Sequence, residues 1–372
     1  MTGNDGAVSL GIDIGSSAVK VSLIDGQHAS IIGSAVSPKD AEYAIASPHP
    51  GWADQDPDLW WTHVLSACAQ LRATWPEAYQ RVAVIGISYQ EHGLVLLDEA
   101  GEPVRPAIIW CDSRTVSTGE AIADSVGRRQ WFDTVANEPG NFTFSKLLWV
   151  KHHEPHLYAK ANVALLPGDF IAYRLTGQLL TTKEGLSEGM FYAFHEKALA
   201  KQLMRVADLD SNLLACCTDS FSRQGLLCSE SARLLGLRDT VEVTFRAGDQ
   251  HANAVGHGVL KSGDCASGAG TSGVLLVVAE TPVTDRLSRV NTFLHVTKAD
   301  QDEQYAVVLC INGVGSAYSW LRRVLGFGSP EMVDYRVMDQ AADAVPCGSD
   351  DVMVLPFGNG TERMLNHRNI HF

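Results

Sequence analysis

The chain has 372 residues, of which 45% are hydrophobic and 19% charged, and its formal net charge is −14. A chain of this length exceeds the size at which one core stops growing, so we expect two globular domains. The negative charge disfavours binding to nucleic acid or to acidic membranes. No apolar run approaches the roughly 20 residues that span a bilayer, and the first residues lack the basic and apolar regions of a signal peptide. The expected location is therefore cytoplasmic, with the eight cysteines reduced.

The first 90 residues predict strands and one helix. The segment AVSLGIDIGSSAVKVSLID alternates apolar with small or polar residues on both sides of a Gly-Ser-Ser turn, which indicates a β-hairpin. A third strand is expected in HASIIGSAVS. Asp56 then caps a helix that has Pro57 at its first position, and the apolar run VAVIGIS predicts a buried strand after it.

The remainder predicts a helical insertion and a second domain. Residues 113–218 show the apolar spacing of helices, which predicts an insertion that forms a cap on the sheet. A strand, a Gly-Thr-Ser-Gly turn and another strand then repeat the pattern of the N-terminus, so we place a boundary near Arg246, with domains at 1–246 and 247–372. Further strands are expected in VNTFLHV, YAVVLCI and DVMVLPF, with helices from near Gly313 and over about 330–344.

Two turns of small residues are candidate phosphate sites. Small residues let backbone amides and hydroxyls approach a phosphate, and a neighbouring carboxylate such as Asp13 can hold magnesium through water. A short glycine motif is also compatible with an ordinary hairpin turn, but two such turns on two similar domains suit a cleft that grips a nucleoside triphosphate. The residues of the two turns are Gly15, Ser16, Ser17 and the nearby Lys20, and Gly270, Thr271, Ser272 and Gly273.

Asp249 is the candidate base. It follows small residues and precedes a segment that predicts a helix, so a role as helix N-cap is the alternative. The two roles are compatible, because the helix dipole would keep the carboxylate ionised and ready to accept a proton. Phosphoryl transfer is often loose, so a base that positions the attacking hydroxyl and takes its proton late need not be strong.

Gln90, Glu91 and His92 form a third candidate cluster. They come directly after the strand VAVIGIS, and ligands of α/β proteins gather at the carboxyl ends of strands. Polar side chains at this place could bind sugar hydroxyls. A histidine after a strand is more commonly a structural residue, so a structural role for His92 is the alternative to sugar binding.

Eight segments together resemble the FGGY family of carbohydrate kinases, and xylulokinases in particular, in order and spacing. They are GIDIGSSAVKVSLID, GWADQDPDLWW, GISYQEHGLVLLD, RPAIIWCDSRT, KLLWVKHHEP, LLPGDFIAYRLTG, AGDQHANAVG and GAGTSGV. The resemblance implies an α/β fold of two ribonuclease H-like domains, similar to hexokinase and actin, around a nucleotide cleft. It also implies ATP and Mg²⁺ as cofactors and a small-molecule sugar as substrate, and it leaves the oligomeric state open, a homodimer being one option.

The resemblance also implies a role for each candidate residue. Asp249 would be the catalytic base and Asp13 a helper beside the magnesium, while the two turns would bind phosphate. Gln90, Glu91, His92 and Gln250 would contact the sugar. The implied reaction converts ATP and D-xylulose to ADP and D-xylulose 5-phosphate.

Departures from the family pattern keep other functions open. Glu91 stands where many xylulokinases carry Met, and Gln250 where many carry Asn. The alternatives are a kinase for glycerol, L-fuculose or a related polyol, or an inactive sugar-binding relative. Relatives continue past GTERM into a segment that holds the adenosine, so we expect a truncated second domain, with weak nucleotide binding and uncertain activity.

Overall fold

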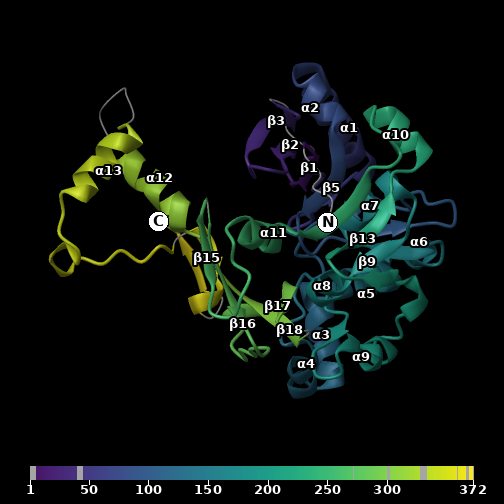
Figure 1. Ribbon diagram of the computed structural model, residues 1–372. Helices are drawn as coiled ribbons and strands as arrows, with labels where there is room; N and C mark the ends of the chain where they lie inside the picture. The colour runs from purple at the N-terminus through teal and green to yellow at the C-terminus, as the bar shows by residue number, and fades with distance from the viewer. Residues whose placement is uncertain are drawn as a thin grey trace.

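The computed structural model has an α/β architecture with two main sheets, of six and four strands, and several two-stranded ladders (Figure 1). The residues that it describes are 6–39, 45–270, 272–299, 302–326, 333–357, 359–365 and 368–371. Thr271, one of the candidate phosphate-binding residues, lies outside them. Within the described ranges, no helix combines the length and the apolarity that crossing a membrane requires.

The first sheet has six strands in the order β13-β14-β5-β1-β2-β3. Their bounds are Val8–Ile14 (β1), Val19–Asp25 (β2), Ile31–Ser37 (β3), Val82–Tyr89 (β5), Phe221–Leu226 (β13) and Glu242–Gly248 (β14). The antiparallel pairing of β1 with β2 confirms the predicted hairpin and sets Asp13 opposite Lys20. Because β1, β5 and β14 are parallel, their carboxyl ends meet at one edge of the sheet.

Helices cover one face of this sheet. They are α1 (Pro57–Thr74), α2 (Pro76–Gln80), α7 (Pro167–Thr176) and α10 (Ser229–Leu235). The predicted start of α1 is confirmed, because the Asp56 side chain accepts a hydrogen bond from the Asp58 amide and Pro57 occupies the first turn. Trp60 on α1 is fully buried in the core, and α1 packs against β2 and β3 while α7 packs against β5 and β14.

The predicted cap is a lobe of helices and short strand pairs. Its helices are α3 (Val116–Val126), α4 (Arg128–Val135), α5 (Thr143–His153), α6 (Pro155–Tyr158), α8 (Lys183–Glu188), α9 (Lys201–Val206) and the 3-10 turn η1 (Ser211–Leu213). Its ladders pair β4 (Asp54–Gln55) with β7 (Ala107–Ile108), β6 (Val95–Leu97) with β8 (Val163–Leu165), β9 (Leu180–Thr182) with β12 (Cys216–Thr218), and β10 (Tyr192–Ala193) with β11 (Ala198–Leu199). The prediction holds only in part, because α7, which falls within 113–218, belongs to the sheet layer.

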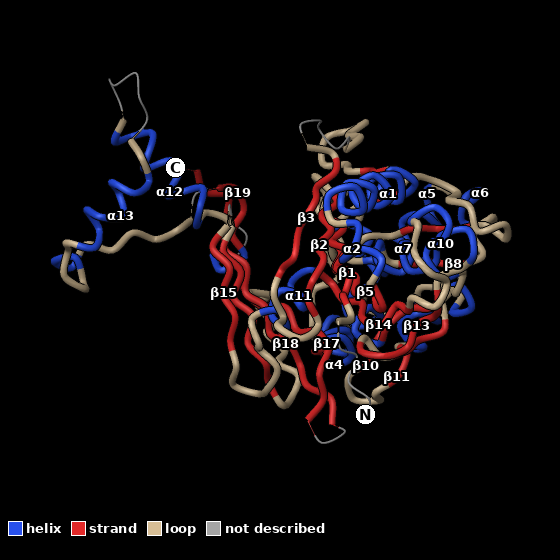
Figure 2. Tube along the Cα trace, turned by 45° about the horizontal axis from the view of Figure 1, so that its top comes forward, coloured by secondary structure: helices blue, strands red, loops and turns tan. Residues whose placement is uncertain are grey.

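The second sheet has four antiparallel strands in the order β15-β16-β18-β17. The elements of this part are α11 (Asp249–Gly256), β15 (Cys265–Ala269), β16 (Gly273–Ala279), β17 (Val290–Ala299), β18 (Asp302–Ile311), α12 (Val314–Leu325), α13 (Tyr335–Asp343), η2 (Ser349–Asp351), β19 (Asn359–Glu362), η3 (Arg363–Leu365) and β20 (Arg368–His371). The repeated strand-turn-strand unit is confirmed as β15 and β16. Figures 1 and 2 both place α11 between the two sheets.

Two expectations for this part need correction. DVMVLPF is not a strand, since residues 352–357 are irregular and Met353 is 83% exposed. An apolar run becomes a strand only where a neighbouring strand pairs with it and other residues cover it. The later predicted helix begins at Tyr335, where Asp334 caps it, rather than near 330; residues 327–332 lie outside the described ranges. The boundary near Arg246 falls inside β14 and stays a prediction, although a division after α11 would leave each sheet whole.

The helical lobe and the second sheet share one core. Asn137 of the lobe is buried and pairs with Thr292 on β17, donating to its carbonyl at 2.7 Å and accepting from its amide at 2.7 Å. The Leu294 amide donates to Ser187 Oγ at 2.9 Å. These bonds fix β17 against the lobe, and with it the side of the sheet that faces the ends of β5 and β14.

Replacing Asn137 with alanine tests this attachment. Asn137→Ala leaves a buried amide and a buried carbonyl of Thr292 without partners, so the free energy of unfolding should fall by about 2 kcal/mol. Asn212→Ala removes an exposed asparagine side chain and serves as the matched control. Chemical denaturation measures both; an Asn137→Ala variant as stable as the control would contradict the role given to this contact.

Candidate functional site

A cavity of about 300 Å³ lies between the edge of the first sheet and the second sheet. It is lined by Gln90, Glu91, His92, Trp110, Asp249, Gln250, Ser272, Val274, Asn291, Phe293, Val308 and Cys310. A groove of about 550 Å³ between α3, α5 and α9 is larger, but it opens to the surface and holds an exposed Lys151–Asp208 ion pair. The smaller cavity gathers six of the predicted residues, among them the candidate base, so it is the candidate site.

Asp249 stands at the start of α11, directly after β14. The side chain is half-buried, and Gln250 Nε2 donates to its Oδ1 at 3.3 Å. Burial raises the pKa of Asp249 to about 7, and the negative charges of Glu91 and Asp13 act in the same direction. The expectation that the helix dipole keeps this carboxylate ionised is therefore wrong at acidic pH: Asp249 changes between its acid and base forms near neutrality.

Asp13 lies on β1 beside the same edge. Ser88 Oγ donates to its Oδ1 at 3.0 Å, and Lys20 Nζ lies 3.5 Å from its Oδ2. Within the described ranges, no three His, Cys, Asp or Glu side chains are grouped to hold a metal ion. One carboxylate still fits Mg²⁺, which is commonly bound through one or two carboxylates, water and substrate phosphate oxygens. Asp13, half-exposed beside Asp249, is the residue that would provide it.

The predicted phosphate turns differ in their surroundings. In the first, the Gly15 amide donates to the Ala18 carbonyl at 3.1 Å, and the Ser16 carbonyl accepts from Gln55 Nε2 at 2.7 Å, while Ser17 is exposed. In the second, the Gly270 amide donates to the Ser272 carbonyl at 3.0 Å, and Ser272 lines the cavity.

Gly273 has a packing role in addition to its place in the second turn. It is the first residue of β16, and a Cβ there would lie 2.5 Å from Val314 Cγ2 on α12. A side chain at this position would therefore push α12 away from the sheet.

Gln90 joins the cavity to the first sheet. Its amide donates to the Ile14 carbonyl at 2.8 Å, and its Nε2 donates to Gln55 Oε1 at 3.0 Å. The residue is 2% exposed, and its Oε1 has no hydrogen-bond partner among the described residues. A buried carbonyl oxygen without a partner is costly, so a ligand hydroxyl or a water molecule in the cavity would stabilise it.

His92 has a left-handed backbone, with φ of 61°. Its amide donates to Glu188 Oε1 at 2.6 Å, and its carbonyl accepts from Lys146 Nζ at 2.6 Å. Lys146 is fully buried, and burial lowers its pKa to about 7. The ring packs edge-on against Phe142, with 4.4 Å between centroids. These contacts hold the His92 ring at the cavity wall.

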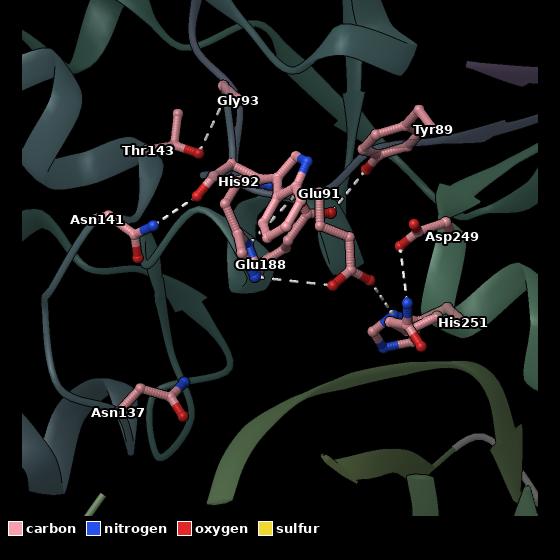
Figure 3. A network of polar contacts seen from close by, with 12 residues as sticks. Tyr89, Glu91, His92, Gly93, Asn137, Asn141, Thr143, Glu188, Asp249 and His251 are labelled. Atoms are coloured by element: carbon pink, nitrogen blue, oxygen red, sulfur yellow. Dashed lines mark hydrogen bonds and ion pairs between the residues drawn. The ribbon is translucent and has the colours of Figure 1, made fainter. Parts of the chain in front are cut away.

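Glu91 is the centre of a buried polar network (Figure 3). Its Oε1 lies 3.2 Å from His251 Nδ1, and its Oε2 lies 3.7 Å from His92 Nε2. Burial alone would raise the pKa of Glu91, but the hydrogen bond with His251 and the charge of His92 lower it below its ordinary value. The pKa of Glu188 is raised well above its ordinary value by burial and by the charge of Glu91. Glu188 Oε2 accepts from Tyr89 at 2.9 Å.

The site therefore unites six of the predicted residues and adds several that the sequence analysis did not single out. The cavity is lined by Gln90, Glu91, His92, Asp249, Gln250 and Ser272, and its described lining does not include Asp13, Gly15, Ser16, Ser17, Lys20, Gly270 or Gly273. The additions are His251, Glu188, Lys146, Asn291 and Phe293. Of these, His251 could have been found, because it lies two residues after the candidate base; the others come from distant segments whose approach depends on the fold.

A family model and many known proteins match the chain. The model of the N-terminal domain of the FGGY family of carbohydrate kinases matches residues 8–256. Xylulose kinase of Escherichia coli (strain K12) is 28% identical over 352 residues, which cover 94% of this chain and 69% of that protein.

Solved structures agree with this result. The xylulose kinase structure from Rhodospirillum rubrum has a TM-score of 0.83 and 26% identity, over 93% of this chain and 69% of that one. The gluconate kinase structure from Lactobacillus acidophilus has a TM-score of 0.81 and 20% identity, over 94% and 68%. The chain spans 61% of the length of the xylulose kinase of Staphylococcus epidermidis (strain ATCC 12228 / FDA PCI 1200), to which it is 29% identical over 319 residues.

The raised pKa of Asp249 predicts a pH-dependent effect on stability. The ordinary pKa is 3.8 and the folded pKa about 7. Between these values the unfolded chain releases a proton that the folded chain keeps, so the wild type loses stability as pH rises to about 7. Asp249→Asn has no carboxyl group at this position and does not lose this stability. The difference between its melting temperature and that of the wild type should therefore be about 1 to 3 °C more positive at pH 8 than at pH 5.

Asp264 provides the control for this measurement. Its pKa is lowered by backbone hydrogen bonds from Leu260 and Lys261, so it is ionised at both pH values. Thermal denaturation of Asp264→Asn should show the same difference from wild type at pH 5 and pH 8. If Asp249→Asn behaved in the same pH-independent way, the raised pKa of Asp249 would be refuted.

Proposed function

The chain belongs to the FGGY family of carbohydrate kinases, which confirms the resemblance seen in its motifs, and we propose that this ATP-dependent sugar kinase phosphorylates D-xylulose to D-xylulose 5-phosphate. The choice of D-xylulose is supported by the similarity to xylulose kinases over 94% of the chain. The fold is likewise that of the actin and hexokinase type found in the structural relatives. The proposed setting is the cytosol.

The observation that carries the proposed chemistry is the position of Asp249. Its carboxylate enters the cavity from the start of α11, with a pKa of about 7. In the ionised form it can accept a hydrogen bond from the sugar hydroxyl, orient the oxygen toward the γ-phosphorus and take the proton as the new O–P bond forms and the bond to ADP breaks. A base with a pKa near the working pH suits this task.

Two groups of residues are proposed to bind the reactants. The sugar would be held by Gln90, Glu91, His92 and Gln250. Gln90 Oε1, which is buried and has no partner among the described residues, would accept a hydrogen bond from a sugar hydroxyl. The turns at Gly15–Ser17 and Gly270–Gly273, with Lys20, would bind the phosphates. When bound through Asp13, Mg²⁺ would neutralise negative charge on those phosphates.

Asp249→Ala tests the proposed base. Turnover should fall by about 10³-fold, which is within the usual range for loss of a positioned base, while sugar affinity should change by less than about tenfold. A coupled assay for ADP release measures turnover and titration calorimetry measures sugar binding. Asp264→Ala is the control, and a variant at position 249 that kept most of its turnover would remove Asp249 from the mechanism.

A substrate panel tests the proposed sugar. We expect D-xylulose to give a higher kcat/KM than glycerol, D-ribulose or L-fuculose in the ADP-release assay. Clear preference for another compound would assign the chain to another branch of the family. Sugar binding without turnover of any compound would favour an inactive sugar-binding protein.

A further inference from the structure

Negative charge dominates the candidate sugar site. Two carboxylates, Glu91 and Asp249, line the cavity, and a third, Asp13, is close enough to raise the pKa of Asp249. Among the described residues that line the cavity there is no Lys or Arg. The charged partners of Glu91 are two histidines, His92 and His251.

His251 fixes one oxygen of Glu91. It lies on the first turn of α11, is 2% exposed, and places Nδ1 3.2 Å from Glu91 Oε1. Its ring packs edge-on against Phe293, with 6.1 Å between centroids. Because His251 is buried on a short helix that begins at Asp249, it has little freedom to move away from Glu91.

Gly248 fixes the stem of Glu91. A Cβ on Gly248 would lie 2.5 Å from Glu91 Cγ and 2.4 Å from its Oε1, so the side chain lies directly on the backbone of β14. The glycine is therefore required for this close approach. Glu91 is held between β14 and His251, and it cannot swing out of the cavity wall without losing both contacts.

The second oxygen of Glu91 keeps capacity for a ligand. Oε2 lies 3.7 Å from His92 Nε2, which is beyond hydrogen-bond length. A carboxylate oxygen accepts more than one hydrogen bond, and both residues line the cavity. An ionised carboxylate accepts strong bonds from hydroxyl groups and offers none to a second carboxylate.

We infer that Glu91, positioned by His251, is a specificity residue that accepts hydrogen bonds from an uncharged sugar and excludes sugars carrying a carboxylate. This inference rests on the proposed function, because it concerns the sugar site of the same reaction. A sugar acid placed beside Glu91 would meet like charge in a partly desolvated site whose described lining residues include no lysine or arginine to offset it.

Binding of two matched ligands tests the inference. D-Xylulose and D-xylonate have the same number of carbon atoms and differ in charge. Titration calorimetry at pH 8 should show wild type binding D-xylulose about 100-fold more tightly than D-xylonate. Glu91→Gln should reduce this ratio to about tenfold or less, mainly through tighter binding of D-xylonate.

Control variants keep the result interpretable. Glu196→Gln removes an exposed carboxylate and should leave the ratio unchanged. If Glu91→Gln fails to fold, Glu91→Met provides a neutral side chain of similar length for the same comparison. An unchanged ratio in a folded Glu91 variant would overturn the inference.

The pH dependence of the ratio tests the positioning role of His251. Besides Glu91, the groups facing His251 are Glu184 on α8, which favours its charged form, and His295 on β17. Without the imidazole, Glu91 should take up a proton at higher pH. As pH falls, each variant should lose its discrimination against D-xylonate at a characteristic midpoint. We expect this midpoint to lie at least about one pH unit higher in His251→Ala than in the wild type, and His251→Asn to reverse part of that shift. A purely structural role would weaken binding of both ligands without moving this midpoint.

Measuring ADP release beside binding separates this inference from the proposed function. Selective binding of D-xylulose without its phosphorylation would contradict the kinase proposal alone. Phosphorylation of D-xylulose with equal binding of D-xylonate would contradict the role of Glu91 alone. Failure to bind any sugar would contradict both. Because Asp249 titrates near pH 7 in the wild type and the charge of Glu91 contributes to that pKa, ratios are compared between variants at each pH.

Discussion

The parallel alignment of β1, β5 and β14 is the constraint on which the site depends. Parallel strands carry their carboxyl ends to the same edge of a sheet, so residues far apart in sequence become neighbours. Asp13 lies at the end of β1, Glu91 follows β5 and Asp249 follows β14. The second sheet then closes this edge into a cavity, held there by the bonds between Asn137 and Thr292.

Crowding of carboxylates gives the site its chemistry. His251 and His92 stabilise the charge of Glu91 and lower its pKa, while burial and then the charge of Glu91 raise the pKa of both Glu188 and Asp249. The network thus separates the pKa values of three similar groups: that of Glu91 is lowered, that of Glu188 is raised well above its ordinary value, and that of Asp249 is about 7. Such separation of pKa values by environment is what assigns distinct roles to acidic residues in enzymes. Because Glu91 is the proposed specificity residue and its charge also contributes to the raised pKa of Asp249, we expect changes at Glu91 to affect specificity and catalysis together.

The sequence predicts the local elements well and the long-range contacts poorly. The hairpin of β1 and β2, the capped start of α1 and the position of Asp249 at a strand-to-helix junction all follow from nearby residues. DVMVLPF fails as a strand because pairing depends on a distant partner, which pattern alone does not reveal. Lys146 and Glu188 escape notice for the same reason: their contacts with His92 join segments about 50 and 100 residues apart.

The most direct test of the central claim is the pH dependence of kcat/KM for D-xylulose phosphorylation. Asp249 must be ionised to accept the hydroxyl proton, and its pKa is about 7. Activity should therefore rise between pH 6 and pH 8 with a midpoint near pH 7, and the midpoint should fall in Glu91→Gln, which removes one of the charges that raise it. A profile that is flat over this range in the wild type would contradict the assignment of Asp249 as the base.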